Sequence, residues 1–185
     1  MQTNQYLSKI LDELSQAAGR ISDIEAEAFV QHIMEANRIY AAGAGRSGLM
    51  MRAFAMRLMH LGIETYVVGE TVTPGLAAGD MLIIGSGSGE TKSLLSMAQK
   101  AHSLHATIAS VTIFPESSIG KLSRLTVSLP GAPKDQSQQE AVTIQPMGSL
   151  YEQTLFLFLD AVILRLMDIR GLDSQAMYHR HANLE

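Results

Sequence analysis

The sequence predicts an α/β protein, a three-layer sandwich in which helices flank a five-stranded parallel sheet. Short apolar runs alternate with longer segments of helical spacing, an order typical of a parallel sheet covered on both faces. The chain has 185 residues, of which 46% are hydrophobic, so it holds enough apolar material for the core of one domain. Two glycine-rich turns each follow a short apolar run and precede a helical pattern, as at the ligand-binding edge of such sheets.

Helical spacing accounts for most of the chain. Tyr6, Ile10 and Leu14 fall on one face of an N-terminal helix. A second helix begins near Ser22, since Ser22 and Glu25 have the spacing of a capping box. Further helices are expected at Ser47–Leu61, Thr91–Leu104, Ser117–Leu122 and from Ser149 to about Ile169.

Short apolar runs between these helices predict the strands. They are expected at Arg38–Ala42, Thr65–Val68, Met81–Ile84, Thr107–Ile113 and Leu125–Leu129. The polar stretch Lys134–Gln139 is expected to be a mobile loop. No internal repeat or long linker divides the chain, so residues 1–185 are expected to form a single domain.

The last long helix carries an almost continuous apolar stretch, Leu155–Met167, interrupted by Asp160 and Arg165. A membrane span needs about 20 apolar residues, so a helix buried on nearly all sides is the better interpretation. A domain of this size rarely encloses a whole helix, so part of it is expected to face another subunit. Four methionines crowd an earlier helix and fit an interface or ordinary core equally well: Met50, Met51, Met56 and Met59. These features favour a homo-oligomer, in which the N-terminal helix (about 1–20) and the C-terminal tail (about 172–185) would pack.

The charge and the cysteine count exclude several classes of function. A formal net charge of −4 argues against broad electrostatic binding to nucleic acid or to an anionic membrane. The sequence contains no cysteine, which excludes disulfides, thiolate metal sites and cysteine nucleophiles. Residues 1–15 show no signal-peptide pattern, so a cytoplasmic location is expected.

The first glycine-rich turn, Gly43–Gly48, lies between a strand and a helix. Its glycines allow a sharp turn and close approach of a ligand, and the helix start offers free N–H groups. Arg46 adds a cation and Ser47 a hydroxyl. The same three spaced glycines match the dinucleotide-binding fingerprint, with Glu70 near the position of an acidic ribose ligand, so a nicotinamide cofactor is a real alternative on this turn alone.

The second turn, Ser86–Thr91, again joins a strand to a helix. Three hydroxyls and two glycines around a helix N-terminus make a good cradle for a phosphate. The turn is not a Walker loop, because the Gly-Lys-Ser/Thr ending is absent. One such turn is as consistent with a serine-rich cap as with a ligand site. Two of them at the carboxyl ends of parallel strands favour a ligand.

These motifs resemble a known family. Ser-x-Ser-Gly-x-Thr at Ser86–Thr91, with Gly-x-Gly-x-Ser at Gly43–Ser47 upstream, is similar to the flavodoxin-like sugar isomerase (SIS) domain. With Gln145–Ser149 and the tail His181–Glu185, the chain resembles the 6-phospho-3-hexuloisomerases over essentially its whole length.

The resemblance implies an activity. The 6-phospho-3-hexuloisomerases convert D-arabino-3-hexulose 6-phosphate to D-fructose 6-phosphate through an enediol, in the ribulose monophosphate pathway of formaldehyde fixation and detoxification. The resemblance implies no cofactor. It implies a homotetramer, and it implies that 3-hexulose-6-phosphate synthase is the neighbouring enzyme of the pathway.

The resemblance also implies catalytic residues. Glu152 is the candidate base, because similar isomerases place a glutamate in the first turn of the last long helix. On spacing alone, Ser149 and Glu152 form a capping box in which Glu152 would only bond the Ser149 N–H. His181 is the secondary catalytic candidate, which would shuttle protons between the two oxygens of the enediol. The alternative is that His181 lies in a solvated C-terminal tail. His179 and His181 are two apart and would point different ways on a helix, so no metal site is expected.

The candidate substrate-binding residues come from the two turns. Arg46 is expected to bind a substrate hydroxyl or to stabilise the enediolate. Hydroxyls and backbone of the turns are expected to hold the phosphate: Ser47, Ser86, Gly87, Ser88, Gly89 and Thr91. Glu90 either contacts the sugar or complements the N-terminus of the helix that follows this turn.

Three rival functions stay open on the sequence. Another phosphosugar isomerase would act on arabinose 5-phosphate or a heptose phosphate. A non-catalytic module would sense a sugar phosphate without turning it over. A nicotinamide-binding protein would be stabilised by NAD, which the serine-rich second turn argues against.

Overall fold

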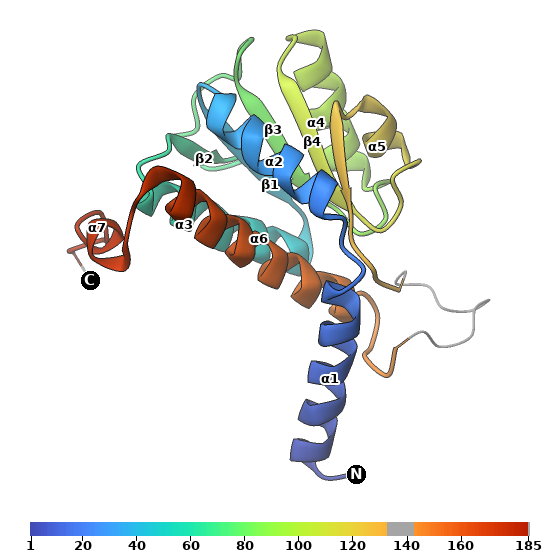
Figure 1. Cartoon of the computed structure of the whole chain (residues 1–185). Helices are drawn as coiled ribbons and strands as arrows, with labels where there is room; N and C mark the ends of the chain where they lie inside the picture. Colours follow the sequence, from blue (N-terminus) through green and yellow to red (C-terminus); the bar gives the residue numbers. More distant parts are fainter. Residues whose placement is uncertain (133–142, 185) are drawn as a thin grey trace.

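A computed structural model describes residues 1–132 and 143–184 of the chain (Figure 1). The loop predicted at Lys134–Gln139 lies outside the described residues. The helices are α1 (Thr3–Ala18), α2 (Asp23–Glu35), α3 (Gly45–His60), α4 (Lys92–Ser103), α5 (Ser118–Leu122), α6 (Ser149–Arg170) and α7 (Ser174–Tyr178). The strands are β1 (Ile39–Gly43), β2 (Thr65–Val67), β3 (Met81–Gly85), β4 (Thr107–Thr112) and β5 (Leu125–Ser128).

The five strands form one parallel sheet in the order β2-β1-β3-β4-β5. This confirms the prediction of a five-stranded parallel sheet. Gly43 on β1 is in register with Gly85 on β3, and Gly85 with Val111 on β4. The two glycine-rich turns therefore leave the sheet side by side at its carboxyl edge.

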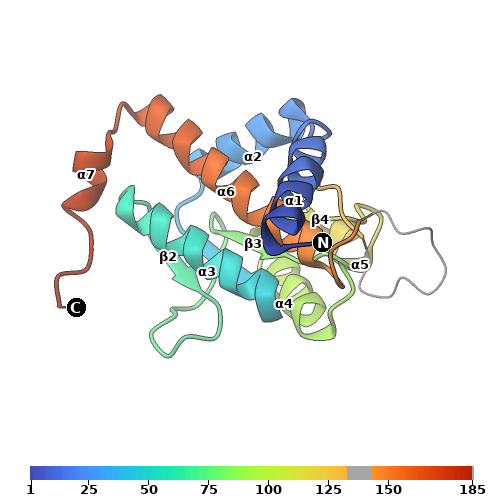
Figure 2. The same ribbon diagram turned by 90° about the horizontal axis from the view of Figure 1, so that it is seen from below.

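Helices cover both faces of the sheet, as predicted. On one face α2, α3 and α6 pack apolar side chains against the sheet. These helices contribute Phe29, Phe54 and Phe158, respectively, to the core on this face. On the other face α4 and α5 pack against Tyr40, Ile84 and their neighbours. Seen from below, α3 and α6 lie side by side and α1 meets the beginning of α6 (Figure 2).

Helix α6 is buried on one side only within a single chain. Its sheet-facing residues, such as Leu155 and Leu159, are buried, whereas Leu157 and Leu164 are 50% and 65% exposed. These exposed side chains lie on the part of α6 that α1, α2, α3 and the sheet leave uncovered, and the expectation that another subunit covers them stays a prediction. The methionines of α3 divide in the same way: Met51 is buried, and Met56 and Met59 are exposed. None of the helices in residues 1–132 and 143–184 combines the length and the apolar composition that a membrane span requires.

The ends of the chain differ from the rest of the fold. Helix α1 projects from the body, with Tyr6, Leu7 and Leu11 exposed (Figure 1). The tail contains the short helix α7, which the sequence did not predict. Asp173 caps α7 by accepting a hydrogen bond from the Ala176 N–H.

Candidate active site

A cavity of about 460 Å³ opens at the carboxyl edge of the sheet. Three segments form it: the turn after β1, the turn after β3 and the first turn of α6. The cavity is lined by five of the predicted substrate-binding residues and by the candidate base: Ser47, Ser86, Gly87, Ser88, Thr91 and Glu152. Parallel strand order explains this meeting of distant segments, because both glycine turns end at the same edge.

The glycines of the first turn serve close packing. A Cβ on Gly48 would lie 2.7 Å from the Gly43 carbonyl oxygen, so these two glycines let the start of α3 touch the end of β1. The turn places Arg46 and Ser47 in the first turn of α3, which begins two residues earlier than predicted. Glu70, the acidic residue of the dinucleotide alternative, pairs instead with Arg52 on α3.

The second turn is folded by its own hydroxyls. Ser86 Oγ accepts a hydrogen bond from the Gly89 N–H at 3.2 Å, and Ser88 Oγ accepts one from the Glu90 N–H at 3.2 Å. Gly89 has a φ of +64°, a left-handed backbone conformation that favours glycine. Thr91 stands at the N-cap of α4 but makes no side-chain cap bond, and it lines the cavity. This leaves a hydroxyl and the start of a helix facing the cavity, a combination suited to an anion.

Two residues of the second turn lie outside the cavity lining. Gly89 packs against Ser117, where a Cβ would lie 1.9 Å from its Oγ. Glu90 caps α5, because its Oε1 accepts a hydrogen bond from the Ser118 N–H at 2.7 Å. The bond from Ser118 and the charge of Lys121 lower the pKa of the Glu90 carboxyl. Glu90 therefore complements the N-terminus of α5 rather than that of α4, the helix that follows the turn, and its contact with a sugar stays a prediction.

Glu152 does not act as a helix cap. Gly148 occupies the N-cap position of α6, and the Ser149 N–H donates to the Pro146 carbonyl. The capping box suggested by the spacing of Ser149 and Glu152 is therefore wrong. Glu152 is only 5% exposed, and its Oε2 lies 2.7 Å from Nε of Arg46. The carboxylate thus sits at the cavity wall beside a cation.

Tyr151 is a cavity residue that the sequence analysis missed. Its hydroxyl donates to the Val111 carbonyl at 2.6 Å and ties α6 to the end of β4. Burial and the neighbouring Glu152 charge raise the pKa of the Tyr151 hydroxyl far above its usual value, so it stays protonated. Its position next to Glu152 in the sequence was the available signal.

His181 lies far from Glu152 within one chain. Its ring stacks on His60 at a centroid distance of 5.4 Å, and both line a cavity of about 430 Å³ with Arg57 and Tyr178. Arg46 and His60 stand at opposite ends of α3, about 20 Å apart at 1.5 Å per residue. Burial, together with Arg57 and His181, lowers the pKa of the His60 imidazole. His60 thus has a structural role, and the tail docks on the far end of α3.

Among residues 1–132 and 143–184, no three or more histidine, aspartate or glutamate side chains gather where they could hold a metal ion. The polar groups around the cavity are hydroxyls, backbone N–H groups, one carboxylate and the guanidinium beside it. Such a set suits a phosphorylated, hydroxyl-rich molecule.

Comparison with known families places the chain. A sequence profile of the SIS domain matches residues 32–157, which contain both glycine turns and Glu152. The chain belongs to the SIS-domain family. The match runs from α2 into α6, so α1 and the tail lie outside the matched part of this SIS-domain protein.

Several relatives are similar over nearly their full length. The SIS-domain chain is 58% identical over 185 residues to a 3-hexulose-6-phosphate isomerase of Bacillus subtilis, covering 100% of each. It is 38% identical over 179 residues to the enzyme of that name from Mycobacterium gastri, covering 97% of this chain and 89% of the relative. A crystal structure of a hypothetical protein from Methanococcus jannaschii, for which that function was inferred, has a TM-score of 0.83 and 34% identity, covering 98% and 99% of the two chains.

Proposed function

We propose that this SIS-domain protein converts 3-hexulose 6-phosphate to fructose 6-phosphate. The observation that carries the proposal is the buried Glu152 carboxylate, 2.7 Å from Arg46, on the wall of the cavity that the serine-rich turn also lines. Full-length identity of 58% to a Bacillus subtilis 3-hexulose-6-phosphate isomerase supports it. The activity is an intramolecular transfer of hydrogen between two carbons of one ketose, and our proposal includes no cofactor and no metal.

The turn after β3 is proposed to hold the phosphate. Ser86, Ser88 and Thr91 line the cavity at the start of α4, where backbone N–H groups and the helix dipole favour an anion. Gly87 brings the backbone close to the ligand, and Gly89 gives the turn its shape. Ser47 approaches from the first turn of α3. Glu90 is proposed to act from outside the cavity, by holding this turn against α5.

Glu152 is proposed to move the proton. Its carboxylate removes the proton from C2, the C2–H electrons form the C2–C3 double bond of the enediol, and the C3 carbonyl oxygen takes up a proton. The same carboxylate returns the proton to C3, while the C2 hydroxyl loses its proton and becomes the new carbonyl. One base on one face of the planar enediol serves both steps.

Arg46 is proposed to stabilise the negative charge of the enediolate. Its side chain is 55% exposed while that of Glu152 is 6% exposed, so the guanidinium is open to solvent beside the cavity that Glu152 lines. Its fixed fork of N–H donors suits two neighbouring oxygens, which are the two oxygens of the enediolate.

His181 is proposed to shuttle protons between these oxygens in the site of a neighbouring subunit, since in its own chain it stacks on His60, at the end of α3 opposite to Arg46 and its partner Glu152. A homotetramer formed through α1, α6 and the tail would bring it there. Exposed apolar side chains on these helices, such as Leu11 and Leu164, support an oligomer. An apolar groove of about 310 Å³ is lined by Phe156 and Leu157 and also by Arg46 and Glu152, so a partner bound there would border the site.

We further propose that the protein is a single domain located in the cytoplasm and that it acts in the ribulose monophosphate pathway. Its substrate is the product of an aldol addition of formaldehyde to ribulose 5-phosphate. A 3-hexulose-6-phosphate synthase would supply it as the pathway neighbour.

A coupled assay tests the proposal. Purified protein is given 3-hexulose 6-phosphate, with chelator and without added metal, and fructose 6-phosphate is followed through auxiliary enzymes. Turnover that persists in chelator is the expected result. Turnover only of arabinose 5-phosphate or a heptose phosphate would replace the substrate, and thermal stabilisation by the sugar phosphate without turnover would make the protein a sensor. Stabilisation by NAD would instead favour the dinucleotide alternative.

A further inference from the structure

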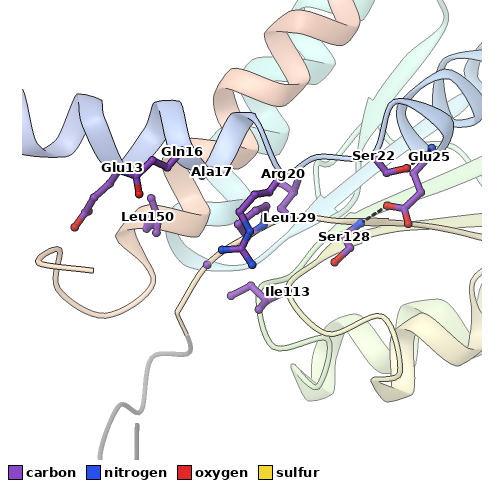
Figure 3. Close-up of a pocket in the computed structure, with 12 residues that line it drawn as sticks. Glu13, Gln16, Ala17, Arg20, Ser22, Glu25, Ile113, Ser128, Leu129 and Leu150 are labelled. Carbon is purple, nitrogen blue, oxygen red and sulfur yellow. Dashed lines mark hydrogen bonds between the residues drawn. The ribbon is translucent and has the colours of Figure 1, made fainter. Parts of the chain in front are cut away.

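Glu13 on α1 holds the segment that leads into α6. Its carboxylate accepts hydrogen bonds from Thr143 Oγ1 at 2.6 Å, from the Ile144 N–H at 2.8 Å and from Gln145 Nε2 at 2.9 Å. Figure 3 shows Glu13 on α1 near Leu150 of α6, and both line one cavity. Three consecutive residues of one segment are thus held by one side chain that lies 130 to 132 positions away in the sequence.

This contact is charged and only partly withdrawn from water, since Ile144 is 51% exposed. Thr143 and Gln145 are buried, with 6% and 5% exposure. Burial alone would raise the pKa of the Glu13 carboxyl, but the hydrogen bonds from Thr143, Gln145 and Ile144 lower it, so the carboxylate is ionised. Hydrogen bonds to an ionised acceptor are about twice as strong as neutral ones. The segment is therefore held firmly on α1.

The held segment determines where α6 begins. The Pro146 carbonyl accepts from the Ser149 N–H at 3.1 Å, and the Gly148 carbonyl accepts from the Glu152 N–H at 3.0 Å. Between them Met147 has a φ of +54°, a conformation unfavourable for a residue with a side chain. Such a residue persists where its surroundings fix the backbone on both sides. Glu13 does this on one side and α6 on the other.

We propose that Glu13 is a positioning residue of the active site, which acts through residues 143–148 to fix the first turn of α6 and hence the Glu152 carboxylate. The inference rests on the proposed function, because it predicts an effect on isomerase turnover. Helix α1 lies outside the residues matched by the SIS-domain profile, so the catalytic carboxylate depends on an element that is added to the matched domain.

Glu13→Gln is the variant that tests this inference. The substitution keeps the size of the side chain but replaces one accepting oxygen of Glu13 by an amide NH₂, which cannot accept a hydrogen bond. Gln145 Nε2 and Thr143 Oγ1 both donate to Glu13 and need an acceptor there. We expect kcat to fall about 10- to 100-fold, whereas KM changes less than about threefold because the phosphate turn after β3 is untouched. Asp12→Asn is the matched control, an exposed carboxylate on the same helix, and it should leave both constants unchanged.

A rescue and an exchange measurement separate positioning from mere stability. The double variant Glu13→Gln, Gln145→Glu reverses donor and acceptor across the 2.9 Å contact and should recover part of kcat. Hydrogen exchange should be faster at the amides of residues 149–152 in Glu13→Gln than in Asp12→Asn. A folded Glu13→Gln protein with wild-type kcat, or with unchanged exchange at these amides, would overturn the inference.

The wild-type protein in the same assay keeps the two proposals distinguishable. An inactive wild type would refute the proposed function, and the exchange measurement would still decide whether Glu13 holds the start of α6. An active wild type with an unaffected Glu13→Gln variant would refute only the positioning role.

Discussion

Arg46 and Glu152 form an ion pair between the first turns of α3 and α6, with Nε and Oε2 2.7 Å apart. The pair is unequal, because the carboxylate is buried and the guanidinium is half exposed. A buried charge is stable only when it is paired or hydrogen-bonded. The guanidinium therefore offsets the cost of burying the Glu152 charge at the cavity wall, where this carboxylate is proposed to act as the general base.

Replacement of Glu152 by glutamine tests the base directly. Because the glutamate makes no helix-cap bond, Glu152→Gln should fold normally and lower kcat by about 10²- to 10⁴-fold. The coupled assay measures kcat, and thermal unfolding reports the fold. Asp168→Asn, an exposed carboxylate on the same helix, should keep wild-type activity. Retained turnover in Glu152→Gln would remove Glu152 from the chemistry.

Arg46→Met removes the cation of the pair and should affect both stability and rate. The buried carboxylate loses a charged hydrogen bond, which we expect to cost about 1–3 kcal/mol of unfolding free energy. If Arg46 stabilises the enediolate as proposed, its loss should lower kcat about 10²-fold or more. In a double-mutant cycle with Glu152→Gln, the stability costs should not add, since one interaction is lost in both. Additive costs would show that the pair is not coupled.

The fold could be predicted from the sequence because its signals are local. Apolar runs of four to seven residues between helical patterns gave all five strands, and the Ser22–Glu25 spacing gave the start of α2, where Ser22 Oγ accepts from the Glu25 N–H. The carboxyl-edge position of both turns followed from the parallel order. Helix α7 was missed, because a helix of five residues depends on its cap and on docking rather than on periodicity.

The site could be predicted only in part, because its decisive contacts join residues far apart in the sequence. The spacing of Ser149 and Glu152 suggested a capping box, but spacing does not show how the backbone enters a helix. Here Pro146 and Met147 bring the chain in so that Gly148 takes the N-cap position. The pairing of Arg46 with Glu152 likewise has no local signal and needs the folded sheet.

Gly89→Ala should deform the turn after β3, which is proposed to hold the phosphate. The new Cβ would lie 1.9 Å from Ser117 Oγ, at a residue with a φ of +64°. Strain and overpacking together should cost about 2–5 kcal/mol of unfolding free energy, and KM for the sugar phosphate should rise. Gly75→Ala is the control, because nothing lies within 4 Å of its Cβ position. Equal unfolding midpoints for the two variants would contradict the expectation.

His60 should make the protein sensitive to acid. Burial, with Arg57 and His181, lowers the pKa of His60 below its ordinary 6.5, so the folded state binds fewer protons than the unfolded chain. The stability from neutral His60 is complete above about pH 6.5 and is lost as the pH falls below it toward the folded pKa. Urea midpoints measured from about pH 7.5 to 5.5 should fall less steeply in His60→Gln than in wild type. Parallel curves would show that His60 is not responsible; exposed His102→Gln is the control.

His181 offers the sharpest test of a site shared between subunits. Within one chain its ring stacks on His60, at the end of α3 remote from Glu152. If it serves a neighbour, His181→Asn should lower kcat as a pure oligomer, and so should Glu152→Gln. Oligomers mixed from the two variants should then regain activity, because some sites combine an intact Glu152 from one chain with an intact His181 from another.

Random mixing in equal amounts gives roughly a quarter of sites with both residues intact. Co-expression of the two variants and the coupled assay measure this recovery, and mixing each variant with itself is the control. A single-chain site allows no recovery, since every chain then carries one defect. Full activity of the pure His181→Asn oligomer would instead show that the docked tail is structural and that Glu152 and Arg46 perform the reaction without it.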